Sequence, residues 1–155
     1  MVNKLAALVL AGGLFALPAV AQDFNQRPTF GTMDLQTNFQ PDPRSIDVTA
    51  GGNINSERLG NGCTGSIANA PDVRLQYQAG RFPLYFSVQS QADTTLVVNL
   101  PDGSWVCNDD LNDLNPGIVL DRPASGQYDI WIGVFGGGTG IPAKLSVSEI
   151  PPQRR

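Results

Sequence analysis

Hydrophobic and polar residues alternate along most of the chain from residue 45 onward. Val73, Leu75 and Tyr77 alternate with polar residues, and the segment from Leu84 to Val88 repeats the pattern. A period of two places one set of side chains on a buried face and the other toward solvent, as in a β-strand. Further alternating segments contain Ile46 and Val48, then Leu96, Val98 and Leu100, then Tyr128, Ile130, Ile132 and Val134, and finally Leu145 and Val147. The pattern predicts an all-β chain of short strands.

Turn-forming residues separate these segments. Residues 51–53 are Gly-Gly-Asn, residues 101–103 are Pro-Asp-Gly, and residues 136–140 include four glycines. Proline presets φ for a turn and glycine accepts a positive φ. The chain has 17 glycines and 12 prolines, and no segment shows a convincing helical period over three turns. Short alternating strands joined by turns predict an antiparallel β-sandwich over residues 45–150.

Residues 1–21 have the features of a secretory signal peptide. Lys4 precedes an apolar run from Leu5 to Leu17, and Ala19-Val20-Ala21 is a typical cleavage pattern. The apolar run is shorter than the roughly 20 residues that a membrane-spanning helix needs. The sequence therefore predicts a secreted or periplasmic protein without a membrane span.

The next segment, residues 22–44, is polar and contains Pro28, Pro41 and Pro43. It shows no sustained periodicity, which predicts an exposed leader or an irregular wrap. Its larger apolar side chains could dock on the sandwich individually: they are Phe24, Phe30, Leu35 and Phe39. Residues 151–155 are predicted to be a short tail.

Cys63 and Cys107 are the two cysteines of the chain. Export to an oxidising compartment makes a disulfide between them the expected outcome. A reactive thiol would need a nearby base or cation, and the chain has no histidine. The sequence predicts a structural disulfide.

The composition excludes several functions. The absence of histidine removes Ser-His-Asp and Cys-His nucleophilic sites and histidine-ligated zinc. The formal net charge is −4, and lysine and arginine form no cluster, which argues against nucleic acid as a partner. An aspartate-based hydrolase is the remaining catalytic hypothesis, although the adjacent Asp109 and Asp110 would point to opposite faces of a strand. We expect a protein that is not an enzyme.

The densest polar segment lies between Cys107 and Asn115, where three aspartates and three asparagines fall within nine residues. Carboxylate and amide oxygens packed closely together are the ligands that calcium prefers. The alternative is a solvated loop in which these side chains form Asx-turns. The candidate metal ligands, including two aspartates from earlier in the chain, are Asp93, Asp102, Asn108, Asp109 and Asp110.

Trp131 lies in the segment from Tyr128 to Phe135, on the opposite face from Ile130 and Ile132. A neighbouring loop could bury it, as most large aromatic side chains are buried, or it could belong to an exposed binding surface. A glycan-binding module would use Trp105, Trp131 or Tyr85 as a stacking platform. Trp105 and Trp131 are the candidate ligand surface.

Several short motifs follow one another in order over residues 93–149. They are Asp93-Thr94-Thr95, the turn Pro101-Asp102-Gly103, Asn108-Asp109-Asp110, and Pro123-Ala124-Ser125-Gly126-Gln127-Tyr128. In this order they resemble the bacterial pre-peptidase C-terminal domain family. The resemblance implies a small, secreted, non-catalytic, jelly-roll-like β-sandwich of the kind often appended to proteases. It also implies calcium near Asp93, Asp109 and Asp110. This chain departs from the family in its Cys63/Cys107 pair and in lacking an attached peptidase domain.

Together these observations lead to two functional hypotheses. The first is a secreted, non-catalytic binding or accessory module that calcium would stabilise and that acts on an unidentified protein. The second is a glycan-binding module in which calcium bridges sugar hydroxyls to the acidic loop. The two differ in whether a tryptophan side chain is accessible to a sugar ring.

Overall fold

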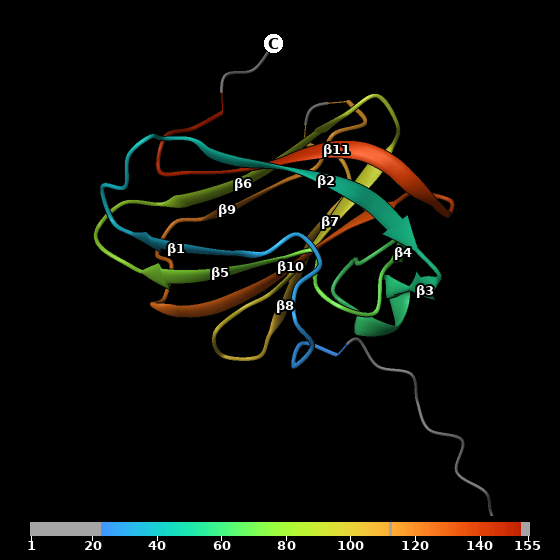
Figure 1. Cartoon of the computed structure of the whole chain (residues 1–155), viewed down its shortest axis with the longest axis horizontal. Coiled ribbons are helices and arrows are strands. Elements are labelled where there is room, and N and C mark those ends of the chain that lie inside the picture. The colour runs from blue at the N-terminus through green and yellow to red at the C-terminus, as the bar shows by residue number, and fades with distance from the viewer. Residues whose placement is uncertain (1–22, 112, 153–155) are drawn as a thin grey trace, which may run out of the picture.

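The computed structural model describes residues 23–111 and 113–152 (Figure 1). The predicted signal peptide and the last three residues of the predicted tail lie outside this part of the chain. The described residues form strands, connecting loops and one short 3-10 turn, η1 (Ser56–Leu59). None of them forms a helix long and apolar enough to cross a membrane.

Two sheets pack face to face as a β-sandwich, which confirms the predicted all-β class (Figure 1). The larger sheet contains seven strands: β1 (Thr32–Gln36), β3 (Ile54–Asn55), β4 (Ser66–Ile67), β5 (Val73–Gln78), β7 (Thr94–Asn99), β8 (Trp105–Asn108) and β10 (Gly126–Val134). The smaller sheet has the order β2 (Arg44–Gly52), β11 (Gly138–Ser148), β6 (Leu84–Ser90) and β9 (Gly117–Leu120). All paired strands run antiparallel except β1 and β5, which run parallel.

The alternating segments of the sequence supply the core between the sheets. Val73 and Leu75 of β5 are fully buried, and Leu84 and Phe86 of β6 face them from the other sheet. Phe86 lies against the ring of Tyr128 with 6.0 Å between centroids. Burial of these side chains is the main driving force for closing the sandwich, because it removes apolar area from water.

The segment predicted as a leader is, from residue 23 onward, part of the sandwich. Residues 32–36 form strand β1, which pairs in parallel with β5 from Thr32↔Arg74 to Gln36↔Gln78. Leu35 and Phe39 are buried in the main core. The prolines that argued against a strand lie outside β1, at positions 28, 41 and 43, so they do not interrupt its ladder. The domain boundary expected at residue 45 is therefore corrected.

A buried carboxylate completes the ladder along β10. Strand β5 pairs with β10 as far as Ile130, and β4 pairs with it only at Val134, so Ile132 lies in the gap between them. The amide of Ile132 donates to Oδ2 of Asp72 at 2.7 Å. Burial raises the pKa of Asp72 to about 7, although the hydrogen bond from Ile132 opposes this shift.

We expect Leu35→Ala to lower the free energy of unfolding by about 2–4 kcal/mol, because it leaves a cavity in the core beneath β1. Gln36→Ala is the matched control, since this neighbouring side chain is exposed, and its effect should stay within about 0.5 kcal/mol. Urea denaturation of both variants measures the difference. Equal stability of the two would show that β1 contributes nothing to the sandwich.

Candidate functional site

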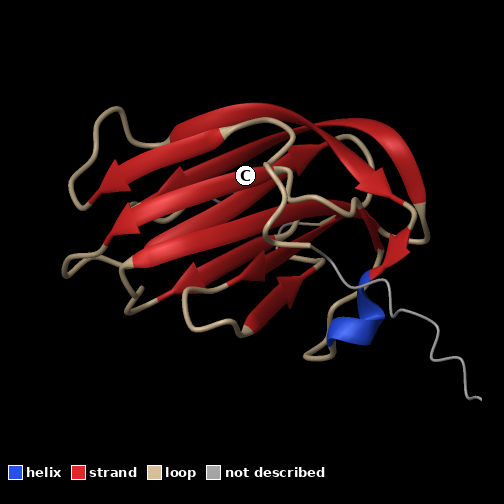
Figure 2. Cartoon of the chain, turned by 60° about the horizontal axis from the view of Figure 1, so that its bottom comes forward, coloured by secondary structure: helices blue, strands red, loops and turns tan. Residues whose placement is uncertain are grey.

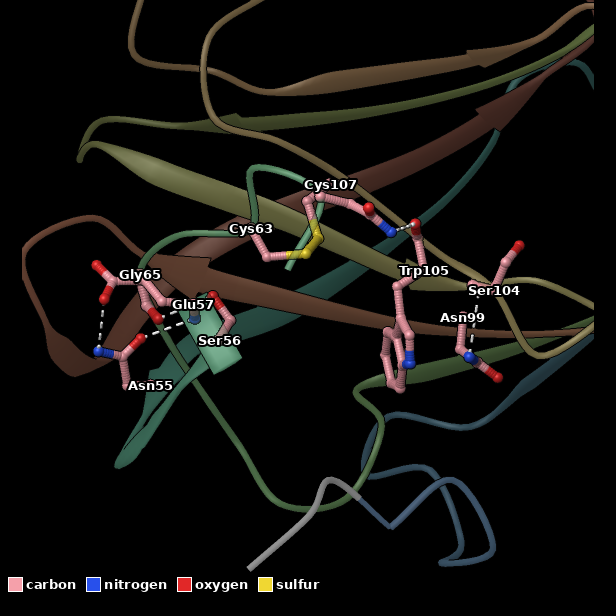
Figure 3. Close-up of a disulfide and its surroundings, with 10 residues drawn as sticks. Asn55, Ser56, Glu57, Cys63, Gly65, Asn99, Ser104, Trp105 and Cys107 are labelled. Carbon is pink, nitrogen blue, oxygen red and sulfur yellow. Dashed lines mark hydrogen bonds between the residues drawn. A yellow bond between two sulfur atoms is a disulfide. The ribbon is translucent and has the colours of Figure 1, made fainter. Parts of the chain in front are cut away.

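Cys63 and Cys107 form the predicted disulfide, with 4.9 Å between their Cα atoms (Figure 3). The bond ties the loop after η1 to strand β8 of the large sheet. Residues 53–68, which include β3, η1 and β4, thus form a flap beside the end of the sheet (Figure 2). The side chain of Ser56 donates to the carbonyl of Gly65 at 3.0 Å and closes the flap on itself.

The flap buries Trp131. Ile54 and Ile67 of the flap pack with Val97 and Trp131 in a second apolar cluster, on the opposite side of the large sheet from the main core. Trp131 is 0% exposed. Its proposed role in a ligand surface is therefore corrected, because the side chain that points away from the main core is covered by the flap. Of the two alternatives considered for Trp131, burial by a neighbouring loop is the one that the structure adopts.

Trp105 is half-buried and stays accessible. Its ring lies against Trp131 with 5.3 Å between centroids and a tilt of 45°. Asn61 of the flap donates to the Trp105 carbonyl at 3.3 Å, and Figure 3 shows the Trp105 ring extending from β8 beside Asn99. Trp105 lines a small hollow together with Phe24, Asn99, Leu100, Pro101, Gly103, Gln127 and Asp129. Of the two predicted tryptophans, only Trp105 can contact a ligand in this structure.

The five predicted metal ligands do not gather at one place. Asp93 precedes β7 and Asp109 follows β8, so the β7–β8 pairing brings them to the same end of the hairpin. Asp102 lies in the turn at the opposite end. Its carboxylate accepts hydrogen bonds from the hydroxyl and the amide of Ser104, which lower the pKa of Asp102. The Oδ1 atom of Asn108 accepts a hydrogen bond from the backbone amide of Gly117 at 2.9 Å, so this oxygen already has a partner within the fold.

The remaining three carboxylates influence one another. Desolvation raises the pKa of Asp93, and the negative charges of Asp110 and Asp109 raise it further. Yet no three aspartate, glutamate, cysteine or histidine side chains of the described residues lie close enough to hold a metal ion. The carboxylates of the described residues therefore form no ready-made metal site. Of the five candidate calcium ligands, Asp93, Asp109 and Asp110 remain. For these three to bind one calcium ion, the loops that carry them would have to move closer together.

Three large apolar side chains belong to the same loops and strand ends as these carboxylates, and the sequence analysis had singled out neither of the two leucines among them. Leu111 is 46% exposed, and Leu114 and Phe135 are each 49% exposed. The amide of Phe135 donates to the Asp93 carbonyl at 3.1 Å, and the amide of Thr94 donates to the Leu114 carbonyl at 3.2 Å. We call this group the acidic corner: Asp93, Asp109, Asp110, Leu111, Leu114 and Phe135. The sequence did offer one sign that the two leucines are exposed. Each follows an aspartate in a loop, where no alternating pattern predicts that an apolar side chain is buried.

Reduction of the disulfide should expose Trp131, because the flap then loses its covalent tie to β8. In a Trp105→Phe background Trp131 is the sole tryptophan, so its fluorescence should become quenchable by acrylamide after reduction. The bond should contribute up to about 4 kcal/mol to stability on the chain-entropy model. Unchanged quenching in the reduced, still folded protein would show that apolar packing alone holds the flap.

The calcium prediction is tested by the melting temperature. A cation bridging Asp93, Asp109 and Asp110 would relieve their repulsion and, by binding the folded state, raise the melting temperature. Asp110→Asn should abolish this response, whereas the control Asp102→Asn, at the other end of the hairpin, should keep it. A melting temperature indifferent to both calcium and EDTA would rule the prediction out.

Comparisons with known proteins show structural similarity alone. No protein-family model matches the chain, and no curated protein sequence matches it. The pre-peptidase C-terminal domain of a collagenase from Bacillus anthracis is similar in structure, with 15% identity and a TM-score of 0.47 over 80% of this chain and 100% of that chain. PliG, a periplasmic inhibitor of g-type lysozyme from Aeromonas hydrophila, has 15% identity and a TM-score of 0.39 over 76% of this chain and 96% of that chain. Similarity at this level carries no argument about what the chain does.

Proposed function

We propose that this protein is an exported, non-catalytic accessory module that docks on a partner protein through the acidic corner. Its disulfide supports export, because such bonds form and persist in oxidising compartments. The absence of histidine supports a binding role over catalysis that uses an imidazole as acid or base.

The observation that carries this proposal is the exposure of Leu111, Leu114 and Phe135 at one corner. Single exposed apolar side chains are ordinary on a protein surface. Several that lie close together and are exposed to water mark interaction sites. Each of the three keeps nearly half of its surface accessible. A partner that covered them would gain the free energy of removing this apolar area from water.

Charge defines the chemistry of the partner. Asp93, Asp109 and Asp110 rim the apolar side chains, so the complementary surface carries lysine or arginine next to aliphatic or aromatic residues. A hollow of about 280 Å³ adjoins Phe135 and is lined further by Asn55, Glu57, Thr64, Gly65, Ser66, Gly136 and Gly137. Glu57 places a fourth carboxylate beside this hollow. A single basic side chain of the partner fits the hollow in both size and charge.

The test uses site-specific photo-crosslinking in the organism that produces the protein. A photoreactive phenylalanine analogue at Phe135 or Leu114 should form a crosslink with a discrete partner. The control position is Ile150 after β11, which is apolar and 61% exposed and lies at the far end of β11 from Phe135. Asp109→Asn combined with Asp110→Asn should reduce the crosslink several-fold, and added salt should do the same because it screens the charges.

Two outcomes would contradict the proposal. Equal crosslinking from Ile150 would mean that the acidic corner is not selective. Crosslinks only between copies of this chain would show self-association in place of an accessory role.

A further inference from the structure

The outer face of the large sheet carries a row of amide side chains, well away from the acidic corner. Gln36 of β1 pairs with Gln78 of β5, and Gln76 of β5 pairs with Gln127 of β10. Asn99 of β7 continues the row, because it pairs with Asp129 of β10. The amides therefore cross four neighbouring strands on a diagonal, with about 4.8 Å between paired strands and a step of two residues along β5 and along β10.

Hydrogen bonds hold the middle of this row in place. Gln76 donates from Nε2 to Oε1 of Gln127 at 2.9 Å, and Gln127 donates from its own Nε2 to Oδ2 of Asp129 at 2.7 Å. Arg74 donates to the other carboxylate oxygen of Asp129 at 2.7 Å and neutralises it. The network fixes the orientation of the Gln76 and Gln127 amides before any ligand arrives, which lowers the entropy cost of binding. Each amide still has donor or acceptor capacity left over.

Two hollows lie along the row. One of about 560 Å³ is lined by Asp34, Leu35, Gln36, Gln76, Tyr77, Gln78, Ser125 and Gly126. The other, of about 300 Å³, is the hollow beside Trp105, which Gln127 also lines. Gln76 lines the first hollow, Gln127 lines the second, and the hydrogen bond between the two side chains places the hollows next to each other. We call the two neighbouring hollows together the groove.

Aromatic side chains form the wall at one end of this groove. Trp105 leaves part of its ring accessible while Trp131 supports it from beneath. Phe24 lies on the other side and is 45% exposed. Arg74 holds the Phe24 segment by donating from Nη2 to the carbonyls of Phe24 and Gln26. The groove thus offers an aromatic end and an amide-lined floor on a rigid sheet.

We propose that this groove binds a neutral polysaccharide chain that runs across the strands from Trp105 to Gln36. Planar amides both donate and accept hydrogen bonds, which matches the neighbouring hydroxyl groups of a sugar. An aromatic ring provides an apolar surface for the C–H face of a sugar ring. The pairing of Arg74 with Asp129 leaves Asp34 as the unpaired charge of the groove, which disfavours an acidic polymer. This function uses a different surface from the acidic corner and is independent of it.

The first test measures binding to the unmodified protein. Titration calorimetry with cellohexaose, laminarihexaose, xylohexaose and maltohexaose should give saturable binding for at least one of the four. The corresponding disaccharide should bind at least about tenfold more weakly, because it fills one hollow instead of two. The bound hexasaccharide should also reduce acrylamide quenching of tryptophan fluorescence. Trp105 is the accessible tryptophan, since Trp131 is fully buried.

Two pairs of variants locate the site. Phe24→Ala should weaken binding about tenfold or less, whereas Phe135→Ala, an equally exposed phenylalanine at the acidic corner, should leave it unchanged. Gln78→Ala should weaken binding several-fold, whereas Gln89→Ala on the other sheet should not. These positions are exposed, so each variant should fold.

Three results would overturn the inference. They are no saturable binding to any of the four hexasaccharides, binding with no dependence on chain length, and binding that Phe24→Ala and Gln78→Ala leave unchanged. Because Phe135 belongs to the acidic corner, loss of binding in Phe135→Ala alone would assign the sugar to that corner and overturn the groove.

Discussion

Strand β10 is buried on both faces, and the rest of the structure is arranged around this constraint. One face presents Tyr128, Ile130 and Ile132 to the core between the sheets, and the other presents Trp131. A sandwich of two sheets covers only the first face. The flap of residues 53–68 covers the second, and the Cys63–Cys107 bond keeps it there. Without the flap, the largely apolar surface around Trp131 and Val97 would contact water.

The flap also decides where function can lie on the large sheet. It covers the end of the outer face around Trp131. The apolar cluster that it forms there with Trp131 packs against one side of the Trp105 ring. The rest of that face carries amides, a carboxylate and a guanidinium that bond to one another across strands. The uncovered half is therefore polar and ordered, and a ligand there meets side chains that are already oriented.

The two ends of the sandwich differ in whether their charged side chains have partners within the fold. At one end Tyr77 donates to the carboxylate of Glu149, which also accepts the Asn38 amide, so the buried charge is satisfied by neighbours within the fold. At the acidic corner, carboxylates of the same sign and exposed apolar side chains have no such partners in the described part of the chain. The first arrangement stabilises the chain by itself, whereas the second is favourable only when something else covers it. This contrast is why the proposed partner surface is placed at the acidic corner.

The sequence by itself determined the class of the fold and the pairing of its cysteines. Alternation at Val73, Leu75 and Tyr77 specifies which face of a strand is buried, because successive side chains of a strand point to opposite faces. Two cysteines leave one intramolecular pairing. Tertiary structure alone decided that residues 32–36 join the sheet, because β1 pairs with a strand some forty residues later in the chain. It also decided that a distant flap buries Trp131 and leaves Trp105 accessible, and that Asp102 lies at the far end of the hairpin from Asp93. Contacts between remote segments set these outcomes, and no local pattern of residues encodes them.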